Sequence, residues 1–195
     1  MEGAYLIDIN AMVFGMPRAL FPALAVSVFH GGARTLGYLY AAPAAGALVG
    51  ALTTGWLERI NRQAWAVIVA VCVWGAAIVA FGLVHVLWVA LVLLALAGWA
   101  DVLSAVLRST ILQTCTSEEY RSRISAVQIA VVTGGPRLGD LEAGAVATLV
   151  STQFSIVSGG AACIAGAALL ASLLPGFRRY DRRHPVSQDE PEHQG

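Results

Sequence analysis

Charged side chains inside apolar segments are the residues of this sequence that could do chemistry. They are Arg18, Asp101, Arg137, Asp140 and Glu142, and each falls within a segment apolar enough to lie at membrane depth. A charge at the centre of a bilayer costs about 2.5–3.5 kcal/mol on insertion scales, so each needs a partner, a water-filled cavity or a task. A carboxylate there can carry a proton, and an arginine can pair with it or contact a substrate. These five residues are therefore candidates for a substrate or proton pathway.

Two interpretations stay open for each of the first two candidates. Arg18 lies near the middle of its apolar segment, where it either snorkels or forms a structural ion pair, or else serves the pathway. Asp101, Ser104 and Arg108 are spaced to share one helical face. That face is either a structural charge network at a helix end, or it presents a carboxylate that exchanges a proton, because desolvation favours the neutral acid.

The other three candidates lie in a segment that glycine and proline interrupt. Arg137 and Asp140 are three residues apart and could neutralise each other on a helix, whereas Glu142 has no evident local partner. The preceding Gly134-Gly-Pro136 sequence predicts either one bent span or two half-helices. Irregular backbone at membrane depth occurs where protein or water covers it, so the segment either lines a cavity or lies closer to the interface.

The elements that must position these residues are apolar helices. The chain has 195 residues, of which 57% are hydrophobic and 12% charged, whereas about a quarter of the residues of a soluble domain are charged. A spanning helix needs about 20 residues. The pattern predicts an all-α membrane protein, a six-transmembrane-helix bundle over residues 1–176 in contact with the lipid bilayer, with spans at 5–28, 36–57, 64–84, 86–107, 124–150 and 156–174. We expect residues 177–195 to form a disordered, polar tail.

The arginines give this bundle an orientation. Nine of the twelve basic residues fall in the second predicted loop, the fourth predicted loop and the tail: Arg59, Arg62, Arg108, Arg121, Arg123, Arg178, Arg179, Arg182 and Arg183. Six spans place these three regions on the same side of the membrane. The positive-inside rule makes that side cytoplasmic. We therefore expect a multi-pass protein of the cell (inner or plasma) membrane with both termini in the cytoplasm.

Several function classes are disfavoured. Twelve basic and twelve acidic residues cancel, so nucleic acid is not an expected partner. Three cysteines and four histidines show no metal-ligand spacing, and no metalloprotease, nucleophile-elbow or phosphate-loop motif occurs. We expect no cofactor, no metal and no enzymatic activity. Gly46 and Gly50, in contrast, have the GxxxG spacing that allows another helix to approach closely.

Three stretches of sequence resemble the major facilitator superfamily of transporters. They begin at Leu36 (LGYLYAAP), at Arg108 (RSTILQT, followed by SEEYRSRISAVQ) and at Gly135 (GPRLG). The resemblance is closest to the branch that contains the enterobactin exporter and related drug or siderophore exporters. It implies a twelve-helix fold of which this chain supplies helices seven to twelve, and proton-driven export of a small molecule by alternating access.

The resemblance leaves two hypotheses for the working form of the chain. In the first, it is half of a proton-coupled exporter whose partner is an N-terminal six-helix half or a second copy. In the second, it is a truncated or split-gene product that has no transport activity alone and acts only by pairing with another six-helix half. The substrate itself does not follow from the sequence.

Overall fold

The computed structural model describes residues 18–55, 63–115 and 121–173, and this part of the chain is helical without any strand. A short 3-10 turn, η1, leads directly into α2, and five long helices follow. The elements are η1 (Arg18–Leu20), α2 (Phe21–Ser27), α3 (Ala33–Thr53), α4 (Gln63–Leu83), α5 (Leu87–Cys115), α6 (Arg121–Leu149) and α7 (Thr152–Leu173). The prediction of an all-α protein is thereby confirmed for these residues.

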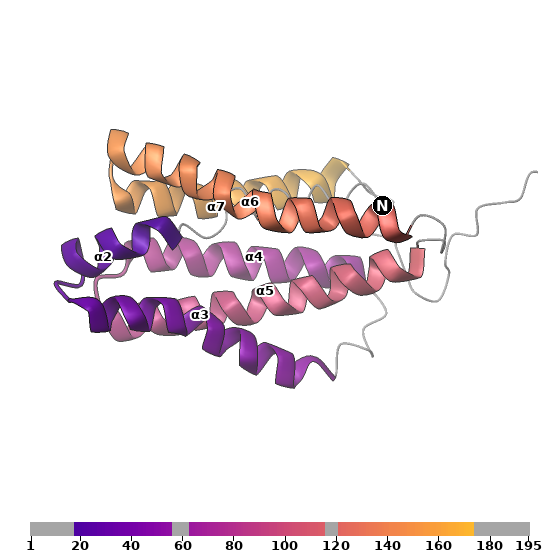
Figure 1. Ribbon diagram of the computed structural model, residues 1–195, viewed down its shortest axis with the longest axis horizontal. Coiled ribbons are helices and arrows are strands. Elements are labelled where there is room, and N and C mark those ends of the chain that lie inside the picture. Colours follow the sequence, from indigo (N-terminus) through magenta and orange to yellow (C-terminus); the bar gives the residue numbers. More distant parts are fainter. Residues whose placement is uncertain (1–17, 56–62, 116–120, 174–195) are drawn as a thin grey trace, which may run out of the picture.

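The helices pack side by side in a closed order (Figure 1). Helix α3 packs on α5, α5 on α4, α4 on α7 and α7 on α6. The order closes because α2 contacts α3 while η1 contacts α6. Chain neighbours are therefore not always packing neighbours, and the short first segment sits between α3 and α6.

The tightest packing joins α3 to α5. A Cβ atom added at Gly46 would overlap the backbone carbonyl of Ala95, and one added at Gly98 would overlap that of Pro43. The two backbones approach this closely only because neither glycine has a side chain. The GxxxG spacing thus does bring another helix close, and that helix is α5 of the same chain. Pro43 lies inside α3, which bends along its length in Figure 1.

Four of the helices are long and apolar enough to cross a membrane, within the residues that the structure describes. These stretches are Ala33–Thr53, Trp65–Leu83, Leu87–Thr110 and Thr152–Leu169. They correspond to the second, third, fourth and sixth predicted spans. Of the first predicted span, residues 5–17 fall outside the described part, and Arg18–Ser27 is a shorter apolar segment.

The fifth predicted span is a single helix. Helix α6 continues from Arg121 to Leu149 with Pro136 inside it, so two half-helices are not what the segment forms. It is long enough to cross a bilayer, but Arg137, Asp140 and Glu142 fall within six consecutive positions. These charges make this part of α6 less apolar than the four helices above.

Helices α5 and α7 end or begin at other residues than the predicted spans, and hydroxyl side chains form hydrogen bonds with the backbone near these ends. Helix α5 extends to Cys115 rather than residue 107, and the hydroxyls of Ser109 and Thr110 donate to the carbonyl of Val106, 2.8 and 2.9 Å away. These bonds satisfy the two hydroxyls within the helix. Helix α7 begins four residues before 156, because the Ser151 hydroxyl accepts the N–H of Phe154 at 3.1 Å as a helix cap. The predicted tail, 177–195, lies outside the described residues.

Candidate functional site

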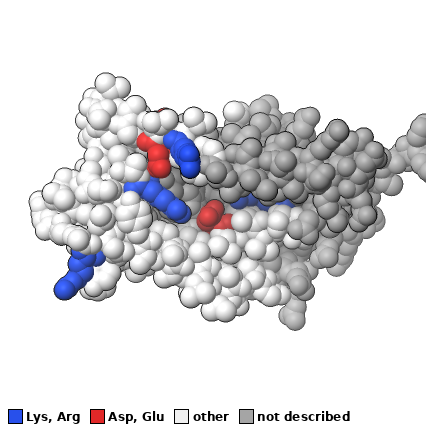
Figure 2. All heavy atoms as spheres, in the orientation of Figure 1, with Lys and Arg blue, Asp and Glu red and all other residues white. Residues whose placement is uncertain are grey.

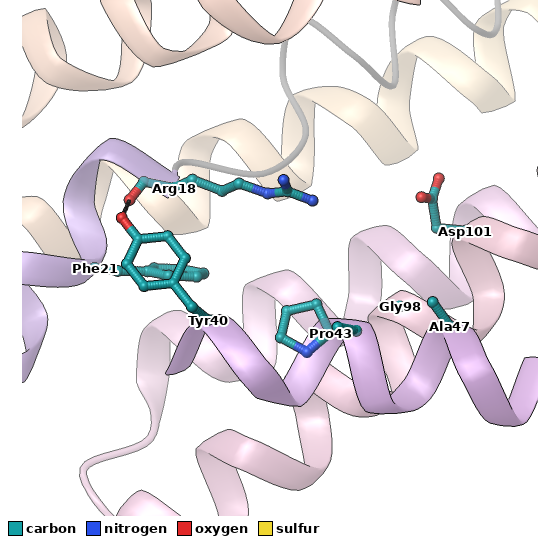
Figure 3. Close-up of a pocket in the computed structure, with 8 residues that line it drawn as sticks. Arg18, Phe21, Tyr40, Pro43, Ala47, Gly98 and Asp101 are labelled. Atoms are coloured by element: carbon teal, nitrogen blue, oxygen red, sulfur yellow. Dashed lines mark hydrogen bonds between the residues drawn. The ribbon is translucent and has the colours of Figure 1, made fainter. Parts of the chain in front are cut away.

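A hollow of about 160 Å³ lies between the first segment, α3 and α5 (Figure 3). Its lining comes from η1, α2, α3 and α5: Arg18, Phe21, Tyr40, Pro43, Ala44, Ala47, Gly98 and Asp101. Small residues make the space, because Ala44, Ala47 and Gly98 hold the helices close without filling the region above them. The floor of the hollow is therefore formed by α3 and α5, which approach each other closely because of Gly46.

Arg18 and Asp101 face this hollow from opposite sides. In Figure 3 the guanidinium of Arg18 extends over the hollow from η1, and the carboxylate of Asp101 rises from α5 on the other side. Both side chains are exposed. The sequence placed them on different spans, and the structure brings these two of the five candidates to one site.

Several acidic and basic side chains of the described residues lie on the face that Figure 2 shows. Figure 2 shows most of the visible ones across the middle of this face, beside a hollowed area. A charge exposed at membrane depth is costly unless water, a substrate or another protein surface covers it. Water, a substrate or another protein surface therefore suits this part of the molecule better than lipid does.

Two aromatic residues of the lining were not among the candidates predicted from the sequence. The rings of Phe21 and Tyr40 pack edge to face with centroids 5.2 Å apart, and Phe21 packs similarly on Phe81 at 6.1 Å. Phe21 is buried, whereas Tyr40 is exposed to the hollow. The only sequence signal for Tyr40 is a hydroxyl-bearing aromatic in a helix of small residues, and it does not indicate what the residue faces.

Asp140 has a partner on another element rather than on its own helix. Its Oδ1 atom accepts a hydrogen bond from the backbone N–H of Ala19, with N···O 3.2 Å. From the sequence, this carboxylate could also pair with Arg137, one turn away on α6. Arg137 is exposed and Glu142 is half-buried, and neither lines the hollow. Asp140 thus contacts the turn that carries Arg18, and Arg137 and Glu142 lie on either side of Asp140 in the sequence of α6.

The shared face of Asp101, Ser104 and Arg108 runs out of the hollow into the bundle. Ser104 is 2% exposed and Arg108 8% exposed, whereas Asp101 is open to the hollow. The helical spacing did not predict these different environments. Among the described residues, no three His, Cys, Asp or Glu side chains are grouped so as to hold a metal ion.

These features define a multi-pass helical membrane protein with a charged hollow between its helices. A family model described as a transmembrane secretion effector of the major facilitator superfamily matches residues 8–193. The chain therefore belongs to this transporter family, which confirms the resemblance seen in the sequence.

Two similar relatives are named as enterobactin exporters. The chain is 34% identical over 174 residues to the enterobactin exporter EntS of Citrobacter koseri, covering 89% of this chain and 42% of that protein. The enterobactin exporter of Salmonella choleraesuis is 32% identical over 170 residues, covering 87% and 41%. The chain spans about two fifths of the length of these curated relatives. No solved structure matches it.

Family and relatives together place the chain in the enterobactin-exporter-like branch of this family.

Proposed function

We propose that this chain is the C-terminal six-helix half of a proton-coupled exporter of a small molecule such as a siderophore or drug. The observation that carries the proposal is the hollow that Arg18 and Asp101 share. Two charged side chains exposed at membrane depth are expensive to maintain, so a pathway role explains both. The match to the exporter family supports the direction of transport.

Each group of the hollow has a chemical task in this proposal. Arg18 binds an anionic or hydrogen-bond-accepting group of the substrate, and its planar guanidinium suits carboxylate or catecholate oxygens. The exposed ring of Tyr40 packs against a flat part of the substrate. Asp101 takes up a proton from one side of the membrane and releases it to the other. Glu142 extends the proton pathway along α6, where Arg137 supplies a fixed positive charge.

The hollow is too small to hold a substrate by itself. Its volume of about 160 Å³ is below the range of roughly 300–1,000 Å³ that is typical of small-molecule sites. A second surface placed over the charged face would enlarge and close the site. We therefore propose that an N-terminal six-helix half, or a second copy of this chain, covers this face during transport by alternating access.

The small volume of the hollow also supports the second candidate function, in which the chain exports nothing alone and acts only when paired with another six-helix half. The two candidates separate in one comparison. Export by this chain without any added partner would favour a self-paired exporter, whereas export only with a partner would favour the obligate half.

We propose that the arginine-rich loops and both termini are cytoplasmic. In a chain whose own cysteines are replaced by alanine, Val86→Cys lies between α4 and α5 on the opposite side. It is expected to react with a membrane-impermeant maleimide added to intact cells. Asn61→Cys, between Arg59 and Arg62, is expected to react only after permeabilisation. The reverse labelling pattern would contradict this orientation.

Export itself is tested with enterobactin, the compound in the names of the relatives. The chain is produced with the remaining part of the Citrobacter koseri relative, which it does not cover, in cells without their own exporter. We expect enterobactin in the medium to rise above that from either piece alone, and to fall when a protonophore collapses the gradient. The positive control is the matched segment of the relative with the same remainder. If that control exports and this chain does not, the proposal is wrong for this substrate.

A further inference from the structure

The backbone that carries Arg18 is held by two other helices. The Ala19 N–H donates to Asp140 Oδ1 of α6 at 3.2 Å, and the Tyr40 hydroxyl of α3 donates to the carbonyl oxygen of Arg18, also at 3.2 Å. Asp140 is 121 residues away from Ala19 in the sequence and Tyr40 is 22 residues away from Arg18. The first of these bonds links the short turn η1 to α6, which is far from it in the sequence.

This turn needs support from outside. It has three residues, and α2, which follows, has no side-chain cap at its N-terminus. The first N–H groups of a helix have no partner within the helix, and a negative charge near them is favourable. Asp140 supplies such a partner from α6. The buried residues Leu20 and Phe21 hold the other end of the turn.

The direction of the Arg18 side chain depends on this turn. Arg18 lines the hollow from the first position of η1, directly before Ala19. A change in the backbone at residue 19 therefore moves the guanidinium relative to Asp101 on α5. The residues that line the hollow come from η1, α2, α3 and α5, so α6 acts on the site through its contact with η1, to which the hydrogen bond with Ala19 belongs.

We propose that Asp140 is a positioning residue, which holds the Arg18 turn as a hydrogen-bond acceptor and does not work as a proton carrier or as the ion-pair partner of Arg137. The functional part of this inference rests on the proposed transport function. The structural part, the anchoring of the turn by α6, does not. An acceptor role and a charge role make different predictions for substitutions at this position.

Asparagine separates the two roles, because its amide oxygen accepts a hydrogen bond but carries no charge or exchangeable acid proton. In Asp140→Leu, of similar size, the acceptor is lost. We expect deuterium exchange at the Ala19 amide to rise by roughly tenfold in Asp140→Leu, since hydrogen bonds to charged groups are among the stronger ones. In Asp140→Asn the rise should stay within about threefold, since a neutral acceptor remains. Leu141→Ala, a neighbouring exposed position on α6, is the matched control and should leave this exchange unchanged.

Export adds a readout that a general loss of folding would not produce. In Asp140→Leu we expect the half-saturating substrate concentration to rise while the maximal rate changes little, and Asp140→Asn to restore it. If Asp140→Asn is as impaired as Asp140→Leu in both measurements, or if Ala19 exchange is the same in all variants, the inference is overturned. If the exchange results hold and no variant or parent exports, the anchoring stands and the transport proposal fails.

Discussion

Replacing Asp101 with asparagine is expected to uncouple export from the proton gradient. Asparagine keeps the size and polarity of the side chain but cannot take up a proton. One pH unit across the membrane corresponds to about 1.4 kcal/mol per proton, which supports roughly tenfold substrate accumulation for each coupled proton. In membrane vesicles with an imposed gradient of one unit, accumulation should fall from that level to about onefold in Asp101→Asn.

The matched control for this variant is Asp140→Asn, the same substitution at a carboxylate of α6 that is expected to act only as an acceptor. It should keep gradient-driven accumulation. Glu142→Gln extends the test along α6, where the proposed proton pathway continues. Normal export at every pH by a chain that carries both Asp101→Asn and Glu142→Gln would contradict the proton-coupling roles of these carboxylates.

Replacing Arg18 with glutamine is expected to weaken substrate binding strongly. A hydrogen bond to a charged group contributes about 1.5–3 kcal/mol, so the half-saturating substrate concentration should rise on the order of 10- to 100-fold. Glutamine retains a donor but loses the charge and the forked geometry of the guanidinium. Initial export rates over a range of substrate concentrations measure this change.

Arg34→Gln provides the comparison for Arg18. Arg34 lies in the first turn of α3 and does not line the hollow. Its replacement removes the same charge from the protein and should leave the half-saturating concentration unchanged. Equal behaviour of the two variants would mean that the effect comes from net charge rather than from the hollow.

The positions of the helices in the sequence were largely predictable because lipid-facing helices are apolar over their whole length. Helix α4, from Gln63 to Leu83, coincides within one residue with the span predicted at 64–84, since no charged side chain interrupts that run. The end of α5 was not predictable from apolar residues alone. Its last turns contain Ser109 and Thr110, whose hydroxyls bond to the backbone of the preceding turn.

The neighbours of each helix were not predictable in the same way. A helix that is apolar all round has no single buried face in its sequence pattern. Gly46 indicated a close approach correctly, yet nothing in its spacing specified that α5 would be the partner. The partner of Asp140 shows the same limit, because a backbone N–H 121 residues away leaves no local pattern. The charged candidates were found by their type, and only packing brought Arg18 and Asp101 to one hollow.

Gradient-driven uptake into inside-out vesicles tests the central claim most directly, namely that the hollow shared by Arg18 and Asp101 is the transport site. Vesicles contain the parent chain with its partner, the Arg18→Gln and Asp101→Asn double variant, or the Arg34→Gln and Asp140→Asn double variant, at equal protein levels. The parent and the second double variant are expected to accumulate enterobactin when a pH gradient is imposed, and the first double variant to show no accumulation. Equal accumulation by both double variants would contradict the assignment of the site.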